Sequence, residues 1–210
     1  LEGERLSKGD AIALASPGFE ATEAICDAAS DMRLDGKGRI VTFSPKVFIP
    51  LTHMCRDFCG YCTFRKDPNQ AGQDIYMTPE QVLEVARAGA KLGCTEALFT
   101  LGERPEQRYP EAKEWLKRRG YRTTLEYLVH VCRLILEETS LLPHANPGTM
   151  SRRELAALKP YNPSMGLMLE STSPKLHAAG GPHEFAPSKR PKVRLRTIEL
   201  AGELRVPFTT

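Results

Sequence analysis

The chain has 210 residues, of which 41% are hydrophobic and 26% are charged, and its formal net charge is +3. This composition is ordinary for a globular chain that can bury a sizeable core, and so small a net charge gives no argument for nucleic acid or a membrane surface as a partner. No apolar run approaches the ~20 residues needed to cross a bilayer.

Residues 1–38 are predicted to form an N-terminal helical lead-in. Within it, the Ala-rich segment 19–32 is expected to be a helix, preceded by a break at Ser16-Pro17-Gly18 and followed by a Gly-rich loop at 34–38, which marks the predicted domain boundary. The start lacks an initiator Met and an apolar secretory segment. We therefore expect the chain to be cut from a longer one.

From residue 39 onward, strands and helices are predicted to alternate. Pro follows Thr78 at a predicted helix start, and Ser151 with Glu154 fits a capping box. Such repeated β–α units predict a parallel sheet with helices outside, as a barrel or an open sheet. The expected strands are 47–51, 96–101, 141–146, 165–169 and 206–210, and the expected helices are 78–92, 109–120, 124–138, 151 onward and 191–204.

Three cysteines, Cys55, Cys59 and Cys62, follow the first strand in the spacing C-x3-C-x2-C. Thiolates suit iron–sulfur clusters, Zn or Cu(I). A fully protein-ligated cluster or a structural Zn takes four ligands. Because no fourth cysteine is nearby, one position is expected to stay open for a substrate or cofactor. The alternative is a Zn loop that borrows His53, although His53 stands only two residues before Cys55.

The chain has six cysteines, and only these three are clustered. A disulfide framework is therefore not expected in a chain of this length. This pattern favours the cytoplasm or another reducing compartment, which a labile cluster would need.

Polar side chains also follow the later strands. Glu103 comes after the second strand, His144 and Asn146 end the third, and Glu170 comes after the fourth. Active-site residues of parallel β–α folds gather at the carboxyl ends of the strands. We therefore expect these residues to share one face with the cysteine loop, where His144 or Asn146 could meet a substrate.

The cysteine loop, with an aromatic residue before its last cysteine, resembles the signature loop of radical S-adenosylmethionine (SAM) enzymes. The resemblance implies a partial (βα)6 barrel, here truncated after about strand five, a [4Fe–4S] cluster on the three cysteines, and SAM bound to the fourth iron. It also implies a set of SAM-contacting residues: Tyr61, Gly102, Glu103, Glu170, Ser171 and Arg194.

The assignment of Arg194 has alternatives. Five positive charges fall within residues 189–196, and such a run is by default a solvated face. Arg194-Leu195-Arg196-Thr197 nevertheless resembles a pattern of related enzymes whose Arg faces the SAM carboxylate, and Arg suits that role. Arg194 is the first choice and Arg196 the alternate. The alternative for this segment is a helix N-cap role for Ser171 or Ser173.

Several longer stretches resemble one family within these enzymes, the 7,8-didemethyl-8-hydroxy-5-deazariboflavin (F0) synthases. They resemble the half of these enzymes that is called the CofG type. They are residues 47–64, 93–103, 143–148 and 166–171. The resemblance implies that a 5′-deoxyadenosyl radical cyclises a tyrosine-derived adduct of 5-amino-6-(D-ribitylamino)uracil with release of ammonia, in coenzyme F420 biosynthesis. The resemblance implies two partners: a reductant, and the CofH-type half that first joins tyrosine to the pyrimidine. Neither nucleic acid nor a membrane is an expected partner. The fragment is expected to be incomplete for activity.

Two other functions stay open on the sequence. One is another radical SAM enzyme, of the biotin-synthase or tyrosine-lyase kind. The other is a non-catalytic iron–sulfur or Zn module, with a nucleic-acid role for the basic run at 189–196.

Overall fold

The computed structural model describes residues 5–15, 18–70 and 75–210. The chain divides into two compact units, Leu1–Phe43 and Ser44–Thr210, so the division falls a few residues after the boundary predicted at residue 38. Each described helix is too short or too polar to cross a bilayer.

The first unit contains the helices α1 (Lys8–Ala15) and α2 (Phe19–Lys37). The predicted break before α2 lies partly outside the described residues, because Ser16 and Pro17 are not described. The prediction of a loop at 34–38 is wrong, since α2 continues to Lys37. It ends at Gly38, which has a φ of 63° and donates its N–H to the carbonyl of Leu34. Glycine tolerates that left-handed conformation and so ends the helix five residues later than expected.

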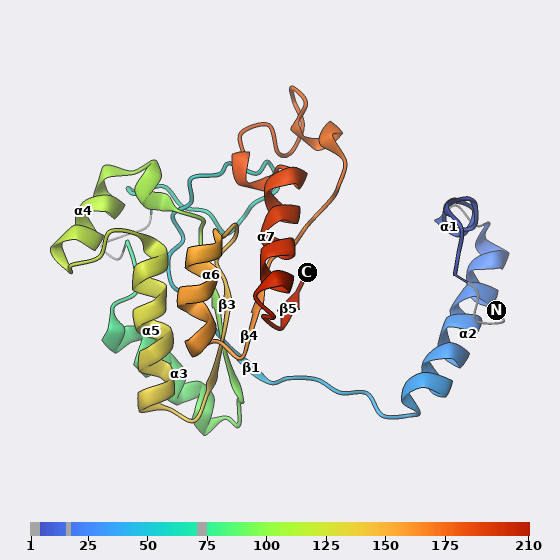
Figure 1. Cartoon of the computed structure of the whole chain (residues 1–210), viewed down its shortest axis with the longest axis horizontal. Helices are drawn as coiled ribbons and strands as arrows, with labels where there is room; N and C mark the ends of the chain where they lie inside the picture. The colour runs from blue at the N-terminus through green and yellow to red at the C-terminus, as the bar shows by residue number, and fades with distance from the viewer. Residues whose placement is uncertain (1–4, 16–17, 71–74) are drawn as a thin grey trace. The chain divides into compact units, whose positions relative to one another are not determined.

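The second unit is built on a five-stranded parallel sheet with the strand order β1-β2-β3-β4-β5. This order confirms the predicted parallel α/β sheet (Figure 1). β4 is shorter than predicted: it ends at Gly166, and the carbonyl of Met168 beyond it accepts a hydrogen bond from Nη1 of Arg194. The strands are β1 (Lys46–Pro50), β2 (Glu96–Thr100), β3 (Leu142–Asn146), β4 (Ser164–Gly166) and β5 (Phe208–Thr209).

Helices follow the strands in turn. The helices α3, α5, α6 and α7 form a row in which each packs against the next (Figure 1). The capping box at Ser151 and the Thr78–Pro79 helix start are both confirmed. The helices are α3 (Pro79–Lys91), α4 (Pro110–Arg118), α5 (Thr124–Glu138), α6 (Arg152–Leu158) and α7 (Pro191–Glu203), with short 3-10 turns at Pro105–Gln107, Lys159–Tyr161, Pro174–His177 and Pro187–Lys189.

The core lies between the helices and one face of the sheet. Ile49, Phe99, Ala145 and Met165 of four successive strands are all fully buried there. The residues that alternate with them point to the other face, where Phe48 remains 48% exposed. The strands therefore have one well-covered face, as expected from their period-two alternation.

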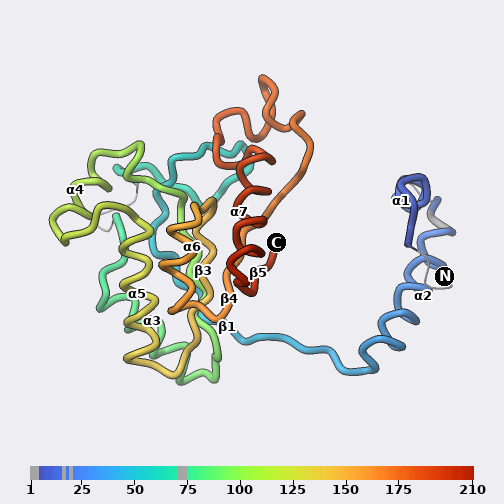
Figure 2. The backbone as a smooth tube through the Cα atoms, viewed as in Figure 1, coloured from blue at the N-terminus to red at the C-terminus, as the bar shows by residue number. Residues whose placement is uncertain are grey.

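Two long loops meet beyond the carboxyl ends of the strands. The loop after β1 carries the cysteines, and the loop after β4 leads into α7. They are joined by backbone hydrogen bonds from Phe58 N to Phe185 O (2.9 Å) and from Gly60 N to Pro182 O (2.8 Å). Figure 2 shows the two segments at the same end of the sheet. The segment 171–190 is thereby held against the cysteine loop.

Candidate functional site

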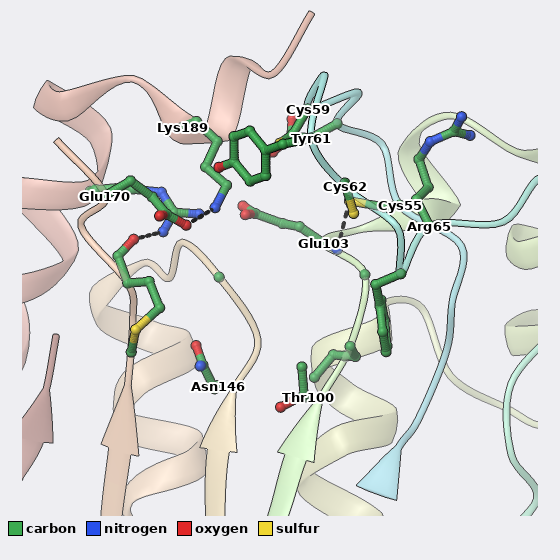
Figure 3. Close-up of a pocket in the computed structure, with 17 residues that line it drawn as sticks. Cys55, Cys59, Tyr61, Cys62, Arg65, Thr100, Glu103, Asn146, Glu170 and Lys189 are labelled. Atoms are coloured by element: carbon green, nitrogen blue, oxygen red, sulfur yellow. Dashed lines mark hydrogen bonds and ion pairs between the residues drawn. The ribbon is translucent and has the colours of Figure 1, made fainter. Parts of the chain in front are cut away.

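A cavity lies where the strand ends and the two loops meet (Figure 3). It brings together most of the residues predicted for the site from separate segments of the chain. Those that line it are Cys55, Cys59, Tyr61, Cys62, Gly102, Glu103, Asn146, Glu170 and Arg194. His144 and Ser171 are not among its lining residues. The residues expected at the strand ends therefore gather around one cavity, with the exception of His144.

The cysteine loop is fastened to the end of β2. The Sγ of Cys55 accepts a hydrogen bond from the backbone N of Glu103 (3.1 Å), and the N of Arg56 donates to the carbonyl of Glu103 (2.9 Å). Burial raises the pKa of the Cys55 thiol to about 11 and also raises the pKa of Cys59. Binding a metal would therefore have to displace protons from these thiols, as is general for thiolate ligands.

The three thiols of this loop are the side chains that could hold a metal centre, and thiolates suit iron–sulfur clusters, Zn or Cu(I). Within the described ranges, no three His, Cys, Asp or Glu side chains are grouped so that they could hold one metal ion. A tetrahedral Zn site requires such convergence, with Zn–S distances near ~2.3 Å. A cubane cluster gives each cysteine an iron of its own, so its thiolates stay farther apart.

Glu103 is a buried acid of the cavity, as is Asp57, and has 5% of its surface exposed. Burial raises its pKa, while a hydrogen bond from Thr149 lowers it. The Nη2 of Arg56 lies 3.6 Å from its Oε1. In Figure 3 the carboxylate points across the cavity toward Lys189 and Glu170. A buried carboxylate in this setting is suited to pair with a cationic group of a ligand.

Arg194 is the buried base, with 4% of its surface exposed. Its Nε donates to the carbonyl of Ser188 (3.0 Å), and its Nη1 donates to the carbonyl of Met168. These bonds use two of the five guanidinium donors, which leaves others for a ligand carboxylate. Arg196, the alternate, is exposed on α7 and pairs with Glu199 and Glu203. The structure thus favours Arg194 over Arg196.

The basic run at 189–196 is only partly the solvated face expected by default. Lys192 and Arg196 are exposed, whereas Arg194 and Lys189 line the cavity. Lys189 forms an ion pair with Glu170 (Figure 3). Glu170 itself has a φ of 66°, a left-handed conformation that is uncommon outside glycine and often accompanies functional sites.

The remaining predicted residues lie at the margin. Ser171 accepts a hydrogen bond from the N of Ser173, and Ser173 is the N-cap of the 3-10 turn Pro174–His177. His144 is buried in β3, with its Nδ1 2.7 Å from the Oγ of Ser164. Asn146, two residues further along β3, reaches the cavity (Figure 3). Of the two candidate substrate contacts, only Asn146 is at the cavity surface.

Tyr61 is tied to the second loop. Its hydroxyl lies 2.8 Å from the Nε2 of His183, which is buried. Burial, followed by the charge of Glu170, raises the pKa of Tyr61 to about 12. The phenol is therefore neutral at ordinary pH, and its ring is fixed at the rim of the cavity between the two loops.

Sequence reasoning missed several lining residues. Asp57 and Arg65 are within or just after the cysteine motif, and Thr100 ends β2, so the strand-end rule could have included them. Lys189 could not be found this way. It reaches the cavity because the segment 171–190 folds back onto the cysteine loop, a long-range contact with no local signal.

The parallel sheet with a three-cysteine loop after its first strand defines the class of protein. The sequence model of the radical SAM superfamily matches residues 49–210, and the chain belongs to this superfamily. Its fold is similar to that of the FeFe-hydrogenase maturase HydG from Carboxydothermus hydrogenoformans, at a TM-score of 0.75 and 24% identity, covering 99% of this chain and 44% of that one. It is also similar to that of methylornithine synthase (PylB), at a TM-score of 0.72 and 18% identity, covering 99% and 55%.

Sequence relatives are more specific. The chain is 52% identical to the 7,8-didemethyl-8-hydroxy-5-deazariboflavin synthase of Methanopyrus kandleri, over 81% of this chain and 51% of that protein. It is 49% identical to the FO synthase of Nocardia farcinica, over 100% of this chain and 25% of that protein. The chain thus spans about half the length of the first relative and about a quarter of the second.

Proposed function

We propose that this chain is part of an F0 synthase, the radical SAM enzyme that forms the deazaflavin of coenzyme F420. The observation that carries the proposal is the convergence of Cys55, Cys59 and Cys62 with Glu103 and Arg194 around one cavity. The relatives named as F0 synthases, at about half identity over most of this chain, support the particular reaction.

In this proposal the three cysteines hold a [4Fe–4S] cluster. Three thiolates on one loop leave one iron without a protein ligand, and that iron is the place for SAM. The bound cluster and SAM together supply the 5′-deoxyadenosyl radical. The protein supplies the ligands, the orientation and the exclusion of water, as is general for cofactor enzymes.

The cavity has charges of both signs at the right places for the zwitterionic amino acid part of SAM. Glu103 would accept hydrogen bonds from its ammonium group, and Arg194 would donate to its carboxylate. Gly102 keeps the end of β2 close to the cysteine loop. Together these residues would hold the methionine part of SAM against the open corner of the cluster.

Other residues would bind the remainder of SAM. Glu170, with its ion-paired Lys189, would face the ribose hydroxyls, with Ser171 beside it in the same loop. Tyr61, fixed by His183, would contact the adenine. Ser171 is the weakest member of this set, because it lies outside the cavity lining.

The substrate would be the tyrosine-derived adduct of 5-amino-6-(D-ribitylamino)uracil, which loses ammonia as the ring closes. Asn146 is the candidate contact at the cavity surface. His144 is the less favoured candidate, because it lies outside the cavity lining and its Nδ1 is 2.7 Å from the Oγ of Ser164. The greater length of the relatives supports a CofH-type partner half, on the same or a separate chain, and a reductant for the cluster.

The test is product analysis with the anaerobically reconstituted protein. It would be supplied with SAM, a reductant and the tyrosine adduct, alone and together with the remainder of the F0 synthase. The proposal expects methionine, 5′-deoxyadenosine, ammonia and F0. Formation of methionine and 5′-deoxyadenosine without F0, in the presence of the complete partner, would instead indicate another radical SAM reaction.

A further inference from the structure

The carboxylate of Glu103 is held by the loop after β3. Thr149 donates to Glu103 Oε1 twice, from its backbone N (3.2 Å) and from its hydroxyl. Thr149 is itself buried. No hydrogen bond from the described residues reaches the other oxygen, Oε2. One carboxylate oxygen is therefore fixed by the protein, and the second remains to accept a hydrogen bond from a ligand.

Gly148 lets this loop come close enough. It has a φ of 87°, and a Cβ built on it would lie 2.2 Å from Glu103 Oε2. Any side chain at this position would collide with the carboxylate. The backbone of Gly148 and the hydroxyl of Thr149 thus form a cradle around Glu103.

A second contact fixes the cradle in place. Arg104, the residue after Glu103, makes a bidentate ion pair with Glu154, with both Nη–Oε distances at 2.9 Å. Its Nη2 also donates to the carbonyl of Thr149 (3.0 Å). Glu154 belongs to the capping box at the start of α6. Arg104 therefore ties the loop after β2 to the loop after β3 at the point where Thr149 meets Glu103.

The backbone of Arg104 supports a specific role for this contact. Its φ is 42°, a left-handed value that is uncommon for a residue with a side chain. Such conformations persist when the surrounding structure holds them and cluster at functional sites. Here the bidentate ion pair and the carbonyl contact hold the residue, and the turn they stabilise is the one that directs Glu103 into the cavity.

We propose that Thr149 and Arg104 are positioning residues that set the direction of the Glu103 carboxylate toward the ammonium group of SAM. This inference rests on the proposed function. Thr149 makes two hydrogen bonds to Oε1, which also lies 3.6 Å from the Nη2 of Arg56, so that Oε2 is presented to the ligand. Arg104 holds the backbone of Thr149 in the position from which it reaches Glu103. The alternative explanation is that the same contacts serve only to stabilise the start of α6.

The test is SAM affinity of the reconstituted chain, measured by titration of the reduced-cluster EPR signal, together with thermal unfolding. Thr149→Val removes the hydroxyl and keeps the shape, while Thr149→Ser keeps the hydroxyl. The expected result is a dissociation constant for SAM raised about tenfold or more in Thr149→Val, as for the loss of one hydrogen bond to a charged group. Thr149→Ser should stay within about twofold of wild type, since it keeps that bond.

Arg104→Gln completes a double-mutant cycle with Thr149→Val. If Arg104 acts through Thr149, its substitution should weaken SAM binding in the wild-type background and add little in the Thr149→Val background. Additive losses of affinity would overturn the role of Arg104. A Thr149→Val variant with lower thermal stability but unchanged SAM affinity would show that the contact is purely structural.

Glu103→Gln separates this inference from the proposed function. If Glu103→Gln weakens SAM binding and Thr149→Val does not, the positioning role is overturned while the proposed function stands. If the wild-type chain binds no SAM, or Glu103→Gln binds it as wild type does, both the SAM site and the positioning role are overturned.

Discussion

The end of β2 passes so close to the cysteine loop that a Cβ on Gly102 would lie 2.0 Å from the carbonyl oxygen of Met54. The same Cβ would lie 2.9 Å from the Cβ of Cys55. The obstacle is backbone, which cannot rotate away as a flexible side chain could. Gly102 is therefore required for the contact between β2 and the loop that carries Cys55, whichever ligand the cavity binds.

Gly102→Ala should force the cysteine loop away from β2. The expected cost in the free energy of unfolding is about 3 kcal/mol, at the upper end of overpacking effects, and cluster incorporation should fall. The measurement is chemical denaturation together with iron content after reconstitution. Gly202→Ala is the matched control, because its Cβ would meet nothing within 4 Å on α7, and there Ala should stabilise the helix by about 0.5–1 kcal/mol. Equal stability of the two variants would contradict the close approach.

Arg194 and Arg196 stand two residues apart on α7 and differ in exposure. Lys in place of Arg keeps the charge but loses the planar set of donors. Arg194→Lys should raise the dissociation constant for SAM about tenfold, since it removes a charge-assisted hydrogen bond, whereas Arg196→Lys should leave it unchanged. Calorimetric titration with SAM would measure both. An equal effect of the two substitutions would mean that Arg194 contributes only to folding of the cavity wall.

His144 should make stability depend on pH. Burial, and then the positive charge of Lys46, lower its pKa below the usual 6.5. The unfolded chain therefore takes up a proton at His144 at a higher pH than the folded chain, so stability falls as pH drops below about 6.5. His144→Gln should reduce the difference in urea midpoint between pH 7.5 and pH 5.5. SAM affinity at pH 7.5 serves as the control and should not change, because His144 is outside the cavity. If His144→Gln leaves the difference in urea midpoint between the two pH values unchanged, the lowered pKa of His144 is refuted.

Much of the fold could be predicted from the sequence because its signals are local. Thr78 and Ser151 begin helices through side-chain caps, and Ile49 and Phe99 alternate with less buried residues along their strands. The position of Glu103 could also be predicted, since residues just after parallel strands gather at one edge of the sheet.

The remainder depends on contacts between distant segments. Lys189 belongs to a basic run whose sequence predicts a solvated face. It nevertheless forms an ion pair with Glu170, because backbone hydrogen bonds join the loop after β4 to the cysteine loop. Thr149 has no sequence signal that pairs it with Glu103, 46 residues earlier. The end of α2 differs from the prediction because Gly36, a residue typical of loops, lies inside the helix, and Gly38 ends it.

The central claim is that Cys55, Cys59 and Cys62 hold a cluster with one iron open to SAM. It is tested most directly by EPR of the anaerobically reconstituted and reduced chain, with and without SAM, and with Cys62→Ala and Cys26→Ala as matched variants. The account predicts a [4Fe–4S]⁺ signal that changes when SAM is added, is lost or altered in Cys62→Ala, and is unchanged in Cys26→Ala. A chain that binds only Zn, or a cluster whose signal ignores SAM, would contradict it.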